Sequence, residues 1–214
     1  MNEDYYQRHA QRFYADTVDV DMSALYQRFL AHLQPGARVL DAGCGSGRDT
    51  KAFSAMGYEV DAFDASAELV ELARQLCGKP VALMRFQDVT ELEKYDGIWC
   101  CASLLHVPEA ELPGVMASLA NALKPGGVWY LSFKYGSGER EKDGRKFTDL
   151  DEIGLKALVV GLNNEGGSNT ERVDNEADEG INAIKIADIW KTGDLRPGRG
   201  SEVWLNGILL KGSK

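Results

Sequence analysis

The sequence predicts a single α/β domain over residues 1–214, built on a mostly parallel β-sheet with helices on both faces. Short apolar runs alternate with segments of helical character, a glycine cluster follows the first apolar run, and the last two apolar runs flank a turn. Parallel strands need crossover connections, and these usually form helices that cover the sheet. An apolar fraction of 44% and a charged fraction of 27% suit a globular domain and exclude fibrous and disordered classes.

The first part of the chain contains five predicted strands with helices between them. The strands are expected at residues 38–42, 58–63, 81–86, 95–101 and 128–133. The helices are expected at residues 48–56, 67–76 and 113–123. Gly57 ends the first helix, because glycine adopts the left-handed conformation common at helix C-termini, and Ser66 can cap the second. Residues 124–127, with one proline and two glycines, predict a turn before the fifth strand.

The last part of the chain is predicted to hold one helix, a polar insertion and two strands. The helix is expected over residues 149–162. Residues 163–183 contain six acids and one base, and we expect them to form an acidic insertion. Strands at residues 185–191 and 203–210 flank a turn-rich stretch, which predicts a C-terminal strand pair over residues 185–211.

Asp41 and the three glycines that follow it carry the strongest functional signal. The pattern D-x-G-x-G-x-G places Gly43, Gly45 and Gly47 in the loop after the first strand, and Asp64 ends the second. In an open parallel sheet, ligands bind beyond the carboxyl ends of the strands, and an acid about 20 residues after such a loop accepts ribose hydroxyls. A cofactor that contains a nucleoside is therefore expected. The third glycine comes one position too early for the dinucleotide fingerprint, which disfavours the alternative of an NAD-dependent oxidoreductase.

This pattern resembles motif I of the class I S-adenosylmethionine (SAM) dependent methyltransferases. Asp64 is similar to the acidic ribose ligand of that family, and Asp88 to the aspartate that takes the adenine amino group. Residues 95–101 resemble the family's fourth strand, and residues 123–128 its turn before the fifth. Residues 45–49 are most similar to the small bacterial tellurite-resistance-type methyltransferases. The resemblance implies a Rossmann-like, mostly parallel seven-stranded sheet with an antiparallel last strand.

The resemblance also implies SAM as the cofactor, S-adenosylhomocysteine as the product, and a SAM-binding core at residues 38–133. The residues expected to bind the cofactor are Asp41, Gly43, Cys44, Gly45, Arg48, Asp64, Ala65, Asp88, Val89 and Tyr14. Arg48 faces either the methionine carboxylate of SAM or solvent, and both alternatives stay open. Asp41 and Asp88 also suit structural roles as carboxylates that close a loop or turn, but their joint spacing favours cofactor binding.

Two further features are expected beside the cofactor. Residues 1–34 are predicted to form a helical lid, with Tyr14 or Tyr6 over the methionine end of SAM; a simple packing helix is the alternative. His106 follows the fourth strand, where side chains in this fold border the substrate, and its ordinary pKa of about 6.5 suits a general base. The alternative is a structural or pocket-lining histidine, since methyl transfer needs positioning more than it needs a base.

The expected reaction is methyl transfer to a small-molecule acceptor by in-line displacement. Bases gather after the fifth strand, among them Lys134, Arg140 and Arg145, and Arg196 and Arg199 lie in the last turn. Lys134, Arg196 and Arg199 are expected to bind an anionic acceptor, and a solvated charged loop is the alternative. A SAM-binding module without transferase activity is the alternative. The sequence after the fourth strand lacks the motifs of DNA base methyltransferases, which disfavours a nucleic-acid substrate.

The composition indicates which binding partners and which cellular compartment to expect. A net charge of −9 predicts repulsion from nucleic acids and from anionic membranes. The sequence shows no basic leader and no apolar run of about 18 residues, so we expect a cytoplasmic protein, as a monomer or homodimer. The four cysteines lack C-x-x-C spacing, and neither a metal site nor a disulfide framework is expected.

Overall fold

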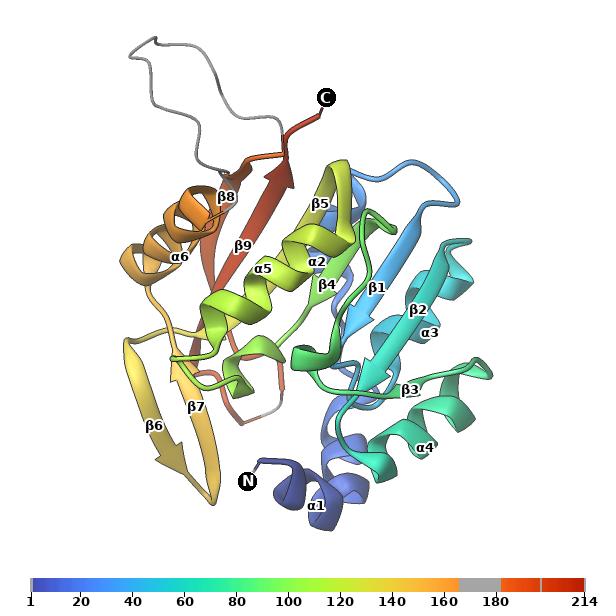
Figure 1. Cartoon of the computed structure of the whole chain (residues 1–214). Helices are drawn as coiled ribbons and strands as arrows, with labels where there is room; N and C mark the ends of the chain where they lie inside the picture. The colour runs from blue at the N-terminus through green and yellow to red at the C-terminus, as the bar shows by residue number, and fades with distance from the viewer. Residues whose placement is uncertain (1, 166–181, 197, 214) are drawn as a thin grey trace, which may run out of the picture.

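A mixed β-sheet forms the centre of the molecule (Figure 1), a computed structural model that describes residues 2–165, 182–196 and 198–213. Its seven strands follow the order β3-β2-β1-β4-β5-β9-β8. The strands are β1 (Arg38–Ala42), β2 (Glu59–Asp64), β3 (Ala82–Leu83), β4 (Tyr95–Cys100), β5 (Leu123–Lys134), β8 (Ile184–Gly193) and β9 (Val203–Lys211). Strand β9 pairs antiparallel with β5 and β8, whereas the other pairs of this sheet are parallel. The predicted fold class is therefore confirmed.

Helices cover both faces of the sheet, as the sequence predicts. They are α1 (Asn2–Thr17), α2 (Ser23–Leu30), α3 (Arg48–Ala55), α4 (Ala67–Cys77), α5 (Leu112–Ala122) and α6 (Glu152–Glu165). Helices α5 and α6 pack on one face through the largest apolar cluster, and α2 and α3 pack on the other (Figure 1). The carboxyl ends of the parallel strands meet at one edge of the sheet, which is left open between these two layers of helices.

An aromatic cluster fixes the layer of α2 and α3 against the sheet. Tyr26 and Phe29 of α2, Phe53 of α3 and Trp99 of β4 are buried, and Trp99 stacks on Tyr130 of β5 with ring centroids 3.9 Å apart. Tyr26 and Phe29 each lie within 6 Å of both Phe53 and Trp99, measured between ring centroids. Close-packed aromatic rings of this kind bury large apolar areas and hold the elements rigidly. Helix α2 is thus part of the core.

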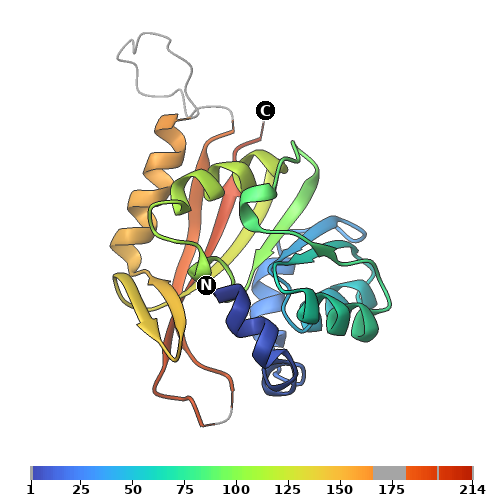
Figure 2. The ribbon, with the colours of Figure 1, turned by 60° about the horizontal axis from the view of Figure 1, so that its bottom comes forward.

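The predicted lid region, residues 1–34, has two different parts. Helix α1 lies across the carboxyl edge of the sheet, between α4 and a β-hairpin (Figure 2). Helix α2 packs into the aromatic core instead. Only α1 has the position expected of a lid, and its function as a lid stays a prediction.

The strand predicted at residues 81–86 is wrong in length. Strand β3 holds only two residues at the edge of the sheet, and a 3-10 helix, η1 (Phe86–Asp88), follows it. The Asp88 carboxylate accepts a hydrogen bond from the backbone N–H of Arg85 at 3.0 Å. This local bond offers the backbone an alternative to strand pairing, which the apolar run at residues 81–86 did not indicate.

The turn predicted at residues 124–127 lies within the bounds of β5, which begins at Leu123. These four residues have no partner in the register of either neighbouring strand, because Leu123 pairs with Tyr95 and Val128 pairs with Gly97 of β4. Gly126 adopts a positive φ of 77° within this stretch. The chain therefore turns out of the ladder here, as predicted, and the strand is longer at its start than expected.

A β-hairpin follows β5, where the sequence predicted a cluster of bases but no strand. Strand β6 (Gly138–Lys142) pairs antiparallel with β7 (Arg145–Asp149), and Asp143 and Gly144 connect them with φ angles of 54° and 73°. An Asp-Gly pair with two positive φ angles is typical of a tight hairpin turn. Because Asp149 ends β7, the helix predicted from residue 149 begins only at Glu152.

The predicted acidic insertion, residues 163–183, lies largely outside the described residues. Helix α6 continues into it as far as Glu165, and β8 begins directly after it, at Ile184. The C-terminal strand pair is confirmed with slightly longer strands than predicted. In the part of the chain that the structure describes, no helix is both long enough and apolar enough to span a membrane.

Candidate functional site

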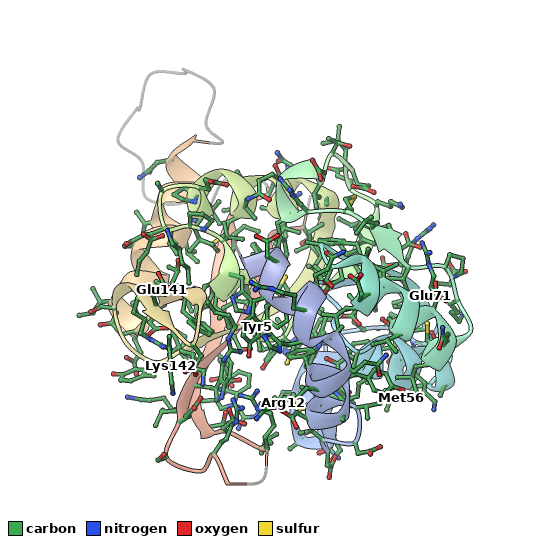
Figure 3. All side chains as sticks on the ribbon, turned by 90° about the horizontal axis from the view of Figure 1, so that it is seen from below. Tyr5, Arg12, Met56, Glu71, Glu141 and Lys142 are labelled. Carbon is green, nitrogen blue, oxygen red and sulfur yellow. The ribbon has the colours of Figure 1, made fainter. Side chains whose placement is uncertain are left out.

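The open carboxyl edge of the sheet contains a cavity of about 1050 Å³. Figure 3 looks onto this edge, with α1 crossing its centre, Tyr5 near the middle of the face, and Glu141 and Lys142 of the hairpin on one side. The glycine loop after β1 lines one end of the cavity, and the hairpin β6–β7 and the β8–β9 turn line the other. A volume at the upper end of the usual range for ligand pockets suits a cofactor and an acceptor together.

Several of the predicted residues meet in this cavity, and others do not. Those predicted cofactor ligands that line it are Gly43, Cys44, Gly45, Arg48, Asp64, Ala65 and Asp88. His106, Lys134, Arg196 and Arg199 line it as well. Asp41, Val89 and Tyr14 are not among the lining residues, whereas Tyr6 is. All predicted site residues except Asp41, Val89 and Tyr14 therefore line one cavity.

The glycine loop has a backbone that other residues would distort. Gly43, Gly45 and Gly47 have φ angles of 74°, 54° and 81°. A Cβ atom on Gly43 would lie 2.6 Å from Cβ of Ser103, and one on Gly47 would lie 2.8 Å from Cβ of Ala73. Positive φ angles and close neighbours both demand glycine, so the spacing that the sequence shows has a steric cause.

Asp64 is the acidic group that the glycine loop holds at the cavity. The backbone N–H of Gly45 donates to Oδ2 of Asp64, and that of Ser66 donates to Oδ1, each at 2.9 Å. Burial raises the pKa of Asp64, and the backbone N–H donors oppose this shift. Each carboxylate oxygen has lone pairs beyond the one bond it accepts. The pair of vicinal hydroxyls of a ribose would supply the donors that these lone pairs need.

Arg48 lies at the cavity but already has an internal partner. Its Nε and Nη2 donate to the two carboxylate oxygens of Asp49 at 2.6 and 2.9 Å, and its Nη1 donates to the carbonyl of Thr17 at 3.2 Å. Asp49 also accepts from Tyr26 Oη and from Trp99 Nε1. Arg48 therefore joins the glycine loop to the end of α1, and of the two alternatives that the sequence left open, the solvent-facing arginine is not the arrangement found.

Asp41 lies behind the glycine loop. Its side chain is buried and accepts a hydrogen bond from the Thr50 hydroxyl at 2.6 Å. Burial, with the charge of Asp49 nearby, raises the pKa of Asp41 to about 8. This geometry matches the structural role that the sequence left open, a carboxyl group that ties the end of β1 to the first turn of α3.

His106 is held between two elements that cover the cavity. Tyr6 of α1 lies 2.7 Å from Nε2, and the carbonyl of Lys146 in β7 lies 3.3 Å from Nδ1. A carbonyl only accepts, so Nδ1 carries the proton and Nε2 accepts from the tyrosine hydroxyl. Burial lowers the pKa of His106 to about 4. A neutral ring that fastens α1 to the hairpin is the role this geometry favours, and the catalytic role stays an untested prediction.

The neutral state of His106 predicts a specific acid sensitivity. With a pKa of about 4 in the fold and of about 6.5 in the unfolded chain, the unfolded state takes up the proton first as the pH falls. This contribution to stability is complete above about pH 6.5 and declines toward pH 4. Between pH 7.5 and pH 5, urea unfolding should show the wild type losing about 2 kcal/mol more than His106→Gln. Equal losses in the two proteins would refute the buried neutral histidine.

The bases predicted to bind an anion are largely paired within the protein. Lys134 contacts Glu202, lies 3.9 Å from Asp194 and sits over the ring of Trp204. Arg196 Nε donates to Asp194 Oδ1 at 2.9 Å. Arg199 forms no ion pair with any residue that the structure describes. Positive charge available to a ligand is therefore smaller here than the sequence suggests.

Comparison with known proteins shows the family to which the chain belongs. A family described as "Methyltransferase domain" matches residues 6–154, from α1 through the glycine loop to the start of α6. The chain belongs to this methyltransferase family. Among the residues that the structure describes, no group of three or more potential metal ligands occurs.

Curated relatives of this methyltransferase-family chain match it over part of their length. A ubiquinone biosynthesis O-methyltransferase from Xanthomonas campestris pv. campestris is 38% identical over 105 residues, which is 46% of this chain and 43% of the relative. The chain thus spans less than half the length of the curated relatives it matches.

Solved methyltransferases share the whole fold at low identity. The 1,6-didemethyltoxoflavin-N1-methyltransferase of Burkholderia thailandensis, with its substrate and S-adenosylhomocysteine bound, superposes with a TM-score of 0.73 at 21% identity, over 99% of this chain and 87% of the other. The magnesium protoporphyrin IX methyltransferase of Synechocystis PCC 6803, with SAM bound, gives 0.70 at 17%, over 99% and 95%. At such identities the likeness establishes the fold.

Two residues that line the cavity, Asp49 and Asp149, were not singled out from the sequence. Asp49 was not recognised as the partner of Arg48, although the two are adjacent in sequence. Asp149 lines the cavity from β7, a strand that was not predicted, and Arg145, one of the bases noted after the fifth strand, lines it from the same strand. The Asp143-Gly144 pair between charged alternating residues was the signal that could have revealed this hairpin.

Proposed function

We propose that this chain is a SAM-dependent methyltransferase that acts on a small-molecule acceptor. The observation that carries the proposal is the Asp64 carboxylate, held at the cavity by the backbone N–H groups of Gly45 and Ser66. An acid fixed against a glycine loop at the carboxyl edge of a parallel sheet is suited to a ribose. The curated relatives named as O-methyltransferases support a transferase and favour a hydroxyl acceptor.

The residues at this end of the cavity fit SAM. Asp64 would accept the ribose hydroxyls. Asp88 uses Oδ2 toward the N–H of Arg85, which leaves Oδ1 for the adenine amino group, and Ala65 and Phe86 line the same cavity. When bound, SAM supplies an electrophilic methyl group on a sulfonium. The protein's part is then to hold the acceptor in line with that group, and positioning can supply about 7–11 kcal/mol of the barrier.

The end of the cavity that is lined by the hairpin β6–β7 and the β8–β9 turn, here called the acceptor end, favours a molecule that carries negative charge. Among the predicted anion ligands, Arg199 supports this, while Lys134 and Arg196 are paired with Glu202 and Asp194. Membership of the tellurite-resistance-type group, a cytoplasmic location and a monomer or homodimer stay predictions, as does the absence of nucleic-acid partners. A SAM-binding module without transferase activity would share the glycine loop. Release of S-adenosylhomocysteine from SAM in the presence of hydroxyl, thiol, amine and chalcogen oxyanion acceptors would distinguish the enzyme from the module.

Calorimetric titration tests the cofactor assignment through Asp64. The wild type should bind SAM and S-adenosylhomocysteine and show no measurable affinity for NAD. Asp64→Asn should weaken SAM binding roughly tenfold or more, because one oxygen that accepts from the ribose is replaced by an amide N–H₂ donor. Glu59→Ala removes the same charge from the exposed, opposite end of β2 and should leave the affinity unchanged. Preferential NAD binding, or equal SAM affinities for Asp64→Asn and the wild type, would overturn the assignment.

A further inference from the structure

The acceptor end of the cavity contains buried polar atoms that the protein itself does not satisfy. Among the described residues, buried side-chain atoms without a hydrogen-bond partner are Ser54 Oγ, Arg145 Nε, Asp149 Oδ1 and Glu202 Oε2. Glu202 has Lys134 as an ion-pair partner, and Ser54 does not line the cavity. Arg145 and Asp149 remain, and both line it from the same strand, β7.

Arg145 is held in place without being neutralised. Its guanidinium lies over the rings of Tyr5 and Phe147, 4.6 and 5.2 Å from their centroids. Its carboxylate contact is to Asp143 at 3.9 Å, and the Asp143 side chain is 65% exposed, so the pair is weak. Arg145 itself is only 13% exposed. A mostly buried guanidinium whose Nε–H has no hydrogen-bond partner among the described residues is suited to an anion.

Asp149 offers the complementary group. One of its oxygens, Oδ2, accepts from Nε of Arg140, which fixes the carboxylate, while Oδ1 has no partner among the described residues. The side chain is nine-tenths buried. A carboxylate oxygen only accepts, so the partner that it lacks must bring an O–H or N–H group.

The two groups stand apart on one face with an aromatic residue between them. Residues 145, 147 and 149 alternate along β7 and therefore share a face, and four strand residues span about 13 Å. Phe147 lies between Arg145 and Asp149, and its ring centroid is 5.2 Å from that of His106. Tyr6 lines the same end of the cavity. A ligand that contacts both Arg145 and Asp149 must pass the aromatic rings between them. Such a ligand has a flat, apolar centre, an anionic group at one end and a hydrogen-bond donor at the other.

We propose that Arg145 and Asp149 recognise the acceptor, and that the acceptor is a hydroxyaryl acid whose anionic group meets Arg145 and whose hydroxyl donates to Asp149. This inference rests on the proposed function, since it names the acceptor class of the same site. It also moves acceptor recognition from Lys134 and Arg196, which are internally paired, to the hairpin. No covalent role is assigned to either residue.

Equilibrium binding of three small probes tests the pair. 4-Hydroxybenzoate carries both groups, benzoate lacks the hydroxyl, and phenol lacks the carboxylate. Arg145→Met should weaken 4-hydroxybenzoate and benzoate roughly 10–100-fold and leave phenol unchanged, because a charge-assisted hydrogen bond is lost. Asp149→Asn should weaken 4-hydroxybenzoate and phenol roughly 5–20-fold and leave benzoate unchanged, because the acceptor atom becomes a donor.

Lys142→Met is the matched control. Lys142→Met removes one positive charge from the same hairpin and the same cavity lining, but the Lys142 side chain is 57% exposed and has Glu202 as its partner. This variant should change the affinity for 4-hydroxybenzoate less than about twofold. Thermal unfolding monitored by circular dichroism establishes that all variants are folded.

Three results would overturn the recognition pair: no binding of 4-hydroxybenzoate to the wild type at about 10 mM, equal losses in Arg145→Met and Lys142→Met, or an Asp149→Asn variant that binds phenol as the wild type does. Calorimetry with SAM separates these failures from failure of the proposed function. If SAM binds with wild-type affinity to every variant while the probes do not discriminate, the pair is wrong and the cofactor site stands. If SAM does not bind to the wild type, the proposed function fails whatever the probes do.

Discussion

Replacing Asp49 by asparagine is expected to lower the free energy of unfolding by about 3–5 kcal/mol, because it removes one partner of a buried ion pair. Asp49 is 5% exposed and accepts four hydrogen bonds, two from Arg48 and one each from Tyr26 and Trp99. Asparagine has one acceptor oxygen, and its N–H₂ group would face donors. The guanidinium of Arg48 would then be buried without a counter-charge.

The Asp49→Asn substitution should affect the cavity as well as the free energy of unfolding. Arg48 donates to the carbonyl of Thr17, so the network under the glycine loop also holds the end of α1. Urea unfolding at neutral pH measures the stability, and calorimetry measures SAM affinity, which we expect to fall with it.

A double variant identifies the cause of the loss. Arg48→Met removes the cation, so Arg48→Met/Asp49→Asn buries no unpaired charge and should be more stable than Asp49→Asn alone. A conservative exposed site, Glu59→Gln, should change stability by less than about 0.5 kcal/mol. If Asp49→Asn costs under 1 kcal/mol, or if the double variant is the least stable of the set, the ion pair does not organise this part of the site.

The contrast between the glycine loop and the Asp49 network shows what a single sequence can predict. Gly43, Gly45 and Asp64 are connected by a local strand–loop–helix geometry that recurs in nucleotide-binding parallel sheets, so their spacing alone indicated a ligand site. Asp49 has partners in α2 and β4, far apart along the chain, and their meeting depends on how α2 packs on the sheet. Local spacing holds no information on that packing.

The hairpin shows a different kind of omission. Its turn, Asp143-Gly144, was visible in the sequence, but the alternating charges of β6 suggested a solvated loop. Phe147, Thr148 and Asp149 of β7 are buried, whereas Lys146, which precedes them, is exposed. Charged residues in a short strand conceal the alternation by which strands are usually predicted. The acceptor end was accordingly the least predictable part of the site.

Replacing Gly43 by alanine is expected to abolish measurable SAM binding, a loss of roughly 100-fold or more, and to destabilise the fold by about 2–4 kcal/mol. Two costs add at this position. The φ angle of 74° is unfavourable for any residue with a Cβ atom, and the new methyl group would lie 2.6 Å from Cβ of Ser103. Ser103 cannot retreat easily, because its hydroxyl donates to the carbonyl of Ala42 at 2.7 Å.

The Gly36→Ala variant separates the effect of the positive φ angle from the effect of the steric clash. Gly36 has nearly the same φ, 77°, but a Cβ atom there would meet nothing within 4 Å, and the residue lies outside the cavity lining. It should therefore lose only about 1–2 kcal/mol of stability and keep its SAM affinity. The double variant Gly43→Ala/Ser103→Gly removes the Ser103 side chain that the new methyl group would meet. It should restore part of the SAM affinity, because the steric clash is relieved while the unfavourable φ angle remains. If Gly43→Ala and Gly36→Ala behave alike in both measurements, backbone strain explains the loss and the close approach to Ser103 does not shape the cofactor loop.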